Sequence, residues 1–202
     1  MVDQQIQGRG ILDERVLAAM RDVPRHRFVP SALSPRAYDD SPLPIGFDQT
    51  ISQPYVVAYM TEAAALPRDA VVLEIGTGSG YQAAVLAQIA AKVYSIEIVP
   101  ELAVRSRTLL DELGYDNIEV KAGDGYRGWP EEAPFDAILG TAAPDHIPPA
   151  LIEQLAIGAR LVIPVGRFQQ EMTIVTKTDD GATTQTTLPV RFVPMTGEAR
   201  QR

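Results

Sequence analysis

The chain has 202 residues, 46% hydrophobic and 22% charged, which is enough for one domain with a buried core. Its net charge of −8, with no basic cluster, disfavours DNA or structured RNA as a partner, because nucleic-acid binding relies on lysine and arginine. The lack of cysteine excludes disulfides and thiolate chemistry, and the two distant histidines, His26 and His146, predict no metal site.

The sequence gives no sign of a membrane span or of export. No apolar run approaches the roughly 20 residues that a membrane helix needs, and the first residues lack the pattern of a signal peptide. We therefore expect a cytoplasmic protein.

Residues 1–66 are expected to form an extension of helices and loops. Apolar residues recur at near-helical spacing from Ile11 to Met20, and Asp13 suits the cap of that helix. The prolines between Pro24 and Pro54 predict a largely irregular stretch, whose apolar residues argue against disorder. A second helix is expected over residues 55–66.

Residues 67–170 alternate between short apolar runs and helical periods. The expected strands cover residues 71–75, 93–97, 118–120, 135–139 and 160–165, and the expected helices cover 82–91, 101–113 and 149–155. This alternation predicts a doubly wound α/β fold, with a parallel sheet covered on both faces.

Residues 171–202 have a different pattern. Runs at Met172–Thr176 and Val190–Val193 flank the turn signal Asp179-Asp180-Gly181, which predicts an antiparallel hairpin at one edge of the sheet. Because there is no internal repeat and no linker, we expect one domain over residues 1–202.

The first strand of the sheet runs into a glycine loop, Gly76-x-Gly78-x-Gly80. Glycines there permit a tight turn and close approach of the backbone to a ligand, although such a loop can also be a turn without a ligand. A loop that binds the pyrophosphate of a dinucleotide prefers Gly-x-Gly-x-x-Gly, and Tyr81 occupies the last position of that pattern. The spacing therefore suits a nucleoside ligand without phosphate.

Two acidic residues end the next strands. Glu97 is placed to accept hydrogen bonds from the ribose hydroxyls of a nucleoside ligand, although it can also be a solvated residue ahead of a helix. Asp124, followed by Gly125, suits the adenine amino group, although Asp-Gly is also a common turn pair. Together with the glycine loop they favour an adenosyl ligand, whereas Trp129 and Phe135 are expected in the core.

The best candidate for chemistry is the polar segment Gln49–Pro54. From the residues alone, Ser52 is favoured as the cap of a helix that begins at Pro54 or Tyr55. His26 reads as a structural or surface residue. His146 is expected near the rim of a site, with nothing nearby to orient it.

Several blocks in order resemble the protein-L-isoaspartate O-methyltransferase family over almost the whole chain. They are Arg9–Ile11, Val23–His26, Phe28–Pro30, Pro42–Gly46, Gln49–Tyr55, Glu74–Tyr81, Gly123–Trp129, Ala133–Ile138 and Arg191–Pro194, the last matching the family's carboxy-terminal strand. The sequence departs from the family at Asp48 and Ala159, where glycine is usual, and at Gly140, where valine is more common.

The resemblance implies a Rossmann-like class I methyltransferase that methylates the free α-carboxylate of L-isoaspartyl residues in damaged proteins. It implies Ser52 as the catalytic side chain and Ile51, Gln53 and Pro54 as substrate-binding residues. It implies S-adenosyl-L-methionine as the methyl donor, with S-adenosyl-L-homocysteine as the product. The cofactor-binding residues that it implies are Thr50, Ile51, Ser52, Glu74, Gly76, Thr77, Gly78, Gly80, Glu97, Ile98, Asp124, Gly125 and Thr196.

Three alternatives stay open from the sequence. They are a methyltransferase acting on another carboxylate, a small molecule or RNA, a nicotinamide-dependent oxidoreductase, and a non-catalytic adenosyl-binding module. The expected partners are isoaspartyl proteins and peptides, without nucleic acid, membrane or metal.

Overall fold

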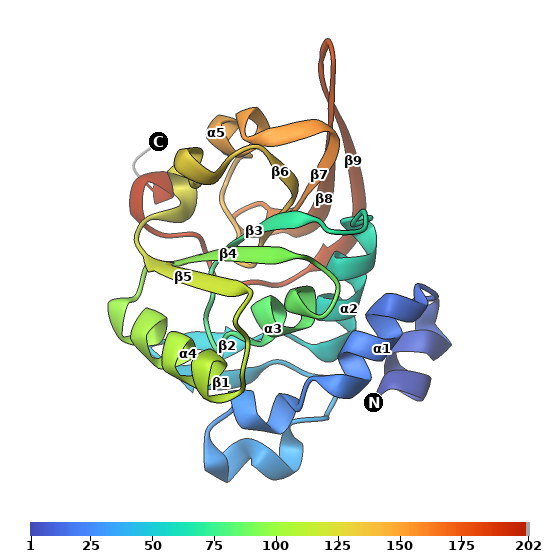
Figure 1. Ribbon diagram of the computed structural model, residues 1–202, viewed down its shortest axis with the longest axis vertical. Coiled ribbons are helices and arrows are strands. Elements are labelled where there is room, and N and C mark those ends of the chain that lie inside the picture. The colour runs from blue at the N-terminus through green and yellow to red at the C-terminus, as the bar shows by residue number, and fades with distance from the viewer. Residues whose placement is uncertain (201–202) are drawn as a thin grey trace.

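The centre of the computed structural model, which describes residues 1–200, is a seven-stranded sheet in the order β5-β4-β3-β6-β7-β8-β9 (Figure 1). Neighbours from β5 to β7 are parallel, and β8 and β9 are antiparallel additions. The strands are β3 (Val71–Ile75), β4 (Lys92–Glu97), β5 (Ile118–Ala122), β6 (Phe135–Gly140), β7 (Leu155–Val165), β8 (Gln170–Thr178) and β9 (Gly181–Val190). The predicted doubly wound α/β fold is confirmed.

Helices cover both faces of this sheet because successive strand residues point to opposite sides. Leu73 and Ile138 pack into one core cluster with Trp129 and Phe135, as predicted, and with Leu151 of α5. Alternate strand residues pack on the other face against α2 and α3. The helices are α1 (Glu14–Asp22), α2 (Pro54–Ala63), α3 (Tyr81–Ala87), α4 (Pro100–Glu112) and α5 (Pro149–Glu153).

The order of the strands locates a ligand site. From β3 the chain moves outward through β4 to β5, then returns to β6 on the other side of β3. In an open α/β sheet, ligands bind beyond the carboxyl ends of the strands at such a reversal. The glycine loop follows β3 directly, so it lies at this position.

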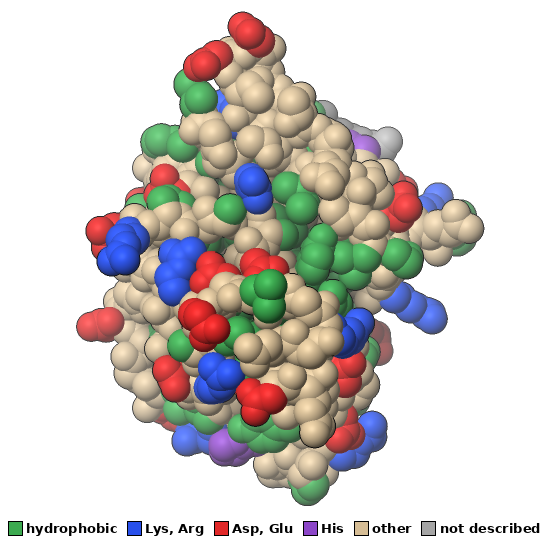
Figure 2. All heavy atoms as spheres, turned by 90° about the vertical axis from the view of Figure 1, so that its right-hand side faces the viewer, with side chains coloured by type: hydrophobic (Ala, Val, Ile, Leu, Met, Phe, Trp, Pro, Cys, Tyr) green, Lys and Arg blue, Asp and Glu red, His purple; other side chains and the backbone are tan. Residues whose placement is uncertain are grey.

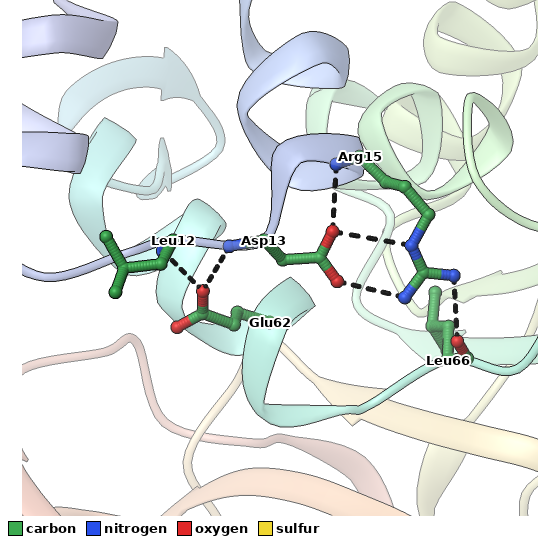
Figure 3. Close-up of polar contacts among 5 residues, drawn as sticks. All are labelled: Leu12, Asp13, Arg15, Glu62 and Leu66. Atoms are coloured by element: carbon green, nitrogen blue, oxygen red, sulfur yellow. Dashed lines mark hydrogen bonds and ion pairs between the residues drawn. The ribbon is translucent and has the colours of Figure 1, made fainter.

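The N-terminal segment is tied to α2 by polar contacts (Figure 3). Asp13 caps α1 as predicted, accepting a hydrogen bond from the Arg15 amide at 2.8 Å. The Glu62 carboxylate of α2 accepts from the amides of Leu12 and Asp13, and Arg15 donates to the carbonyl of Leu66. Short helices precede and follow α1, at Val2–Ile6, Gln7–Arg9, Arg25–Phe28 and Ser31–Arg36.

The proline-rich stretch is more regular than predicted, since it contains a two-stranded hairpin of β1 (Leu43–Gly46) and β2 (Gln49–Ile51). Phe47 and Asp48 form its turn with φ of 54° and 55°. A tight turn between antiparallel strands needs positive φ at both central residues, which explains why glycine suits the position of Asp48.

The C-terminal hairpin has its turn at Asp179–Asp180 as predicted, but its second strand is β9 and not residues 190–193. β9 is rich in exposed threonine, so it carries no hydrophobic signal. The expected strand at Arg191–Pro194 is also wrong, because that segment is irregular apart from a bridge between Pro194 and Ala143. β7 begins at Leu155, earlier than predicted, and its first part pairs with β6 through an irregular register.

Candidate active site

A cavity, here the inner cavity, opens where the sheet order reverses. It lies between the glycine loop, the β1–β2 hairpin and the segment that follows β9. The predicted cofactor residues that line it are Thr50, Ile51, Ser52, Glu74, Gly76, Thr77, Gly78, Glu97, Ile98, Asp124, Gly125 and Thr196. Gly80 does not line it; it precedes α3 at φ 88°, and a side chain there would press on Leu110.

The glycine loop is held close to the ends of the neighbouring strands. The amide of Gly76 donates to the carbonyl of Ile96 at 2.8 Å, and the Thr141 hydroxyl donates to the carbonyl of Gly76 at 2.6 Å. A β-carbon on Gly76 would lie 2.4 Å from the Thr141 Oγ1. The loop backbone therefore forms a bare wall of the cavity that only glycine permits.

Glu97 is buried at the end of β4, so the reading of a solvated residue is wrong. Its two carboxylate oxygens accept hydrogen bonds from the amides of Gly78, at 2.7 Å, and Val99, at 2.9 Å. Each oxygen keeps a further lone pair, so the side chain can accept more hydrogen bonds from a ligand in the cavity.

Asp124 does have the turn role considered from the sequence, and it also lines the cavity. One oxygen accepts from the Tyr126 amide at 2.9 Å and the other from the Glu198 amide at 2.7 Å. The side chain thus ties the helical turn Gly125–Arg127 to the C-terminal turn Gly197–Arg200. An ion pair between Arg127 and Glu198 supports the same junction.

Glu74 is fully buried against the inner cavity. The Ser95 hydroxyl lies 2.5 Å from its Oε2, whereas Oε1 has no hydrogen-bond partner within residues 1–200. Burial raises the pKa of Glu74 to about 8, an effect that the nearby Glu97 charge increases and the Ser95 hydrogen bond reduces. The cavity thus contains a carboxyl group that a cationic ligand would help to ionise.

A second cavity of about 440 Å³, here the outer cavity, lies between α2 and the segment around the end of β9. Figure 2 shows this side of the molecule, where hydrophobic side chains gather below the hairpin whose tip carries acidic residues. Its lining residues are Arg9, Pro42, Thr50, Ser52, Gln53, Tyr55, Val56, Thr141, Leu188, Pro189, Val190, Arg191, Phe192 and Val193.

The two cavities share Thr50, Ser52, Thr141 and Val193. The expectation that Ser52 caps a helix is wrong, because Gln53 is the N-cap of α2 and neither residue gives a side-chain cap. Of the predicted substrate residues, Gln53 lines the outer cavity and Ile51 the inner one, whereas Pro54 lines neither and is the first residue of α2.

Two polar residues of the inner cavity were missed from the sequence. Thr141 directly follows β6, a position where the strand-end argument could have found it. Gln82 is buried in an alanine-rich helix and donates to the Thr61 hydroxyl at 2.9 Å. A polar residue within an apolar helical run was the available signal.

The histidines lie outside both cavities. His26 contacts Tyr38 at the surface. His146 lies 2.8 Å from the Tyr126 hydroxyl, so the expectation that nothing orients it is wrong. Within residues 1–200 no group of three or more potential ligands could hold a metal ion, and no helix is long and apolar enough to cross a membrane.

A family model described as protein-L-isoaspartate(D-aspartate) O-methyltransferase matches residues 1–200. This chain belongs to that family. A protein-L-isoaspartate O-methyltransferase of Gloeobacter violaceus is 59% identical over 203 residues, which cover 100% of this chain and 99% of the relative. One from Opitutus terrae is 60% identical, covering 98% of this chain and 86% of the relative.

Solved structures of the family share the fold. A protein-L-isoaspartate O-methyltransferase with 28% identity superposes with a TM-score of 0.89, covering 98% of this chain and 67% of that one. A Plasmodium falciparum structure described as this enzyme in complex with S-adenosyl-L-homocysteine has 25% identity and a TM-score of 0.84, covering 96% of both chains. Membership of this family disfavours the nicotinamide oxidoreductase and the non-catalytic module.

Proposed function

We propose that this chain transfers a methyl group from S-adenosyl-L-methionine to the free α-carboxylate of L-isoaspartyl residues in damaged proteins and peptides. The observation that carries the proposal is the place of Ser52, on the wall shared by the inner and outer cavities. A group transferred between two ligands must cross where their sites meet, and Ser52 lies there.

The inner cavity suits an adenosyl cofactor. The Gly76–Gly78 backbone would lie beside it, Glu97 would accept the ribose hydroxyls, and Asp124 with Gly125 would border the adenine. Glu74, with its unpartnered buried Oε1, would face the cationic methionine end. S-adenosylmethionine supplies, when bound, a methyl group activated by a sulfonium.

This reaction does not need a general base. An α-carboxylate has a pKa of about 3.5, so the substrate is already ionised and nucleophilic at neutral pH. The chain therefore has to position the carboxylate and exclude water, which accounts for most of the rate advantage available to such a site.

Ser52 would position the carboxylate by donating a hydrogen bond from its hydroxyl. The backbone around Ile51, Gln53 and Pro54 would hold the damaged peptide in extended form, with its flanking residues in the outer cavity. Thr50 and Thr196 border the inner cavity and would contact the cofactor. The methyl ester that leaves the site closes to a succinimide without the enzyme, and hydrolysis returns some normal aspartate.

The proposal is tested by offering labelled S-adenosylmethionine with an isoaspartyl peptide or with its aspartyl twin. We expect label in the isoaspartyl peptide and almost none in the twin. Equal labelling of both indicates a methyltransferase for carboxylates in general. Labelling of neither rejects the repair function and favours a small-molecule substrate.

A further inference from the structure

Arg25 is an arginine buried completely beneath the segment that carries Ser52. Its Nε donates to the carbonyl of Ala37 at 2.7 Å, and its Nη2 donates to the carbonyl of Ser52 at 2.7 Å. Its Nη1 has no hydrogen-bond partner within residues 1–200. The guanidinium carbon lies 4.7 Å from the centre of the Tyr81 ring. Arg25 thus connects the proline-rich stretch to the wall between the two cavities.

No carboxylate forms an ion pair with Arg25 in the described part of the chain. The phenol of Tyr81 does not neutralise it, because burial raises the pKa of Tyr81 well above its usual value. Burial also lowers the pKa of Arg25, but a guanidinium stays protonated near neutral pH. A full positive charge therefore lies in the interior, offset by two carbonyl dipoles and by Tyr81 and Tyr38, but by no carboxylate in the described residues.

A structural tie does not need this charge. Neutral donors can hold two carbonyl oxygens, and burying an unpaired ion is costly. The charge is best explained by an anionic ligand nearby. The α-carboxylate of an isoaspartyl residue is such an anion, and it must bind a chain whose net charge is −8.

The position of the charge fits this ligand. Standard bond lengths place the Ser52 hydroxyl no more than about 8 Å from Nη2. At that distance, with an effective dielectric constant near 20, Coulomb attraction corresponds to roughly ten- to fiftyfold in a binding constant. Arg25 lines neither cavity, and the two arginines that line the outer one fit this role less well, since Arg9 pairs with Asp40 at 3.0 Å and Arg191 is exposed.

We propose that Arg25 is a positioning residue that selects the anionic substrate over neutral ligands, through a buried positive charge placed behind Ser52. This inference rests on the proposed function. It also implies that the neutral methyl ester binds less tightly than the carboxylate, which favours release of the product.

The test compares two peptides that differ only in charge. One carries an isoaspartyl residue, and the other carries the same residue with its α-carboxylate replaced by a carboxamide. Binding is measured by calorimetry to protein saturated with S-adenosylhomocysteine, so that no turnover occurs. The quantity of interest is the ratio of the two dissociation constants, which we call the charge preference.

Three variants separate charge from structure. Arg25→Gln removes the charge and keeps hydrogen-bond donors, whereas Arg25→Lys keeps the charge. Arg160→Gln is the control, because Arg160 also donates to a part-buried backbone carbonyl, but that of Ala63 and not that of Ser52. We expect Arg25→Gln to lose about tenfold or more of the charge preference, and the other two variants to keep it within about threefold.

A fourth variant, Tyr38→Glu, places a negative charge at the surface near Arg25. It tests the inference if Arg25→Gln does not fold. Tyr38 is 42% exposed and close enough to act electrostatically on Arg25. Tyr38→Glu is expected to lower the charge preference about threefold or more relative to Tyr38→Gln.

An unchanged charge preference in Arg25→Gln or in Tyr38→Glu overturns the inference. Equal losses in Arg25→Gln and Arg25→Lys also overturn it, because they indicate a structural role alone. If the wild-type protein binds neither peptide, the proposed function fails and this inference fails with it. A wild-type preference that survives Arg25→Gln overturns only the role of Arg25.

Discussion

The Ser95 hydroxyl lies 2.5 Å from a carboxylate oxygen of Glu74, on two adjacent parallel strands. The same hydroxyl lies 2.6 Å from Oγ1 of Thr77 in the glycine loop. These two hydrogen bonds join the glycine loop to Glu74, the buried carboxyl group of the inner cavity whose pKa is raised to about 8. A change in the protonation of Glu74 is therefore expected to reach the loop through Ser95.

The first prediction concerns stability against pH. An unfolded chain releases the Glu74 proton above its ordinary pKa of 4.5, whereas the folded chain keeps it up to about pH 8. The unfolded state binds fewer protons in this window, so this group makes the protein less stable as the pH rises through it. Thermal unfolding of Glu74→Gln should show a weaker loss of Tm from pH 5 to 8 than the wild type. Glu131→Gln, at an exposed carboxylate, should follow the wild type, and the same slope in all three proteins contradicts the prediction.

The second prediction is that binding of S-adenosylmethionine releases a proton at pH 7. The cofactor carries positive charges, and a cation beside Glu74 favours the carboxylate form. Calorimetry in buffers of different ionisation enthalpy measures the proton released per cofactor bound. We expect release from the wild type and almost none from Glu74→Gln. Equal release from both proteins would assign the proton to another group.

The third prediction separates two costs of adding a side chain to a glycine, which are the strain of a positive φ and a steric clash with a neighbouring residue. Gly76 has φ 101°, and a β-carbon there meets Thr141, whereas Gly114 has φ 81° with open space around it. Gly114→Ala should cost about 1 kcal/mol of stability from strain alone and leave cofactor affinity unchanged. Gly76→Ala should cost about 1–3 kcal/mol more and weaken cofactor binding about tenfold or more. Similar losses in the two variants show that the contact with Thr141 has no effect.

The sequence predicted best those parts of the fold that have a continuous hydrophobic signal. Residues 71–75 and 135–139 are buried on both faces, so their strands are visible as apolar runs. β9 was misplaced because its threonines are exposed and give no hydrophobic signal. The β1–β2 hairpin was missed because it is short and contains Pro44, a residue that rarely marks a strand.

The residues of the site also differ in whether a local sequence pattern predicts them. The glycine loop, Glu97 and Asp124 could be found because each lies at or just beyond the carboxyl end of a strand of the parallel sheet. The role of Arg25 depends on packing against a segment 27 residues away, which no local pattern encodes. Ser52 was assigned a chemical role only through resemblance to a family, because its local sequence favours a helix cap.

The fourth prediction concerns Ser52. Ser52→Ala should lower turnover of an isoaspartyl peptide by roughly ten- to a hundredfold, because the carboxylate loses the hydrogen bond that orients it. Affinity for S-adenosylmethionine, measured by calorimetry, should stay within about threefold. Ser31→Ala, at an exposed serine in a short helix, serves as the control and should match the wild type. Lost cofactor binding with normal turnover at saturation contradicts the role of Ser52.

The fifth prediction concerns Asp48, in the tight turn between β1 and β2. Its φ of 55° is strained for aspartate, and Asp69 is equally strained at 59° but lies elsewhere on the surface. Asp48→Gly and Asp69→Gly should each raise stability by about 0.5 kcal/mol, measured by chemical denaturation.

Only Asp48→Gly should also lower KM for an isoaspartyl peptide, by about two- to fivefold, because it removes a carboxylate close to the segment that we propose binds the anionic substrate. Asp48 lines neither cavity, so this repulsion crosses solvent and should vanish at about 1 M salt. An equal KM for the two variants at low salt means that Asp48 affects only the turn. A difference that persists at high salt instead indicates that the substitution changes the shape of the hairpin that carries Thr50 and Ser52.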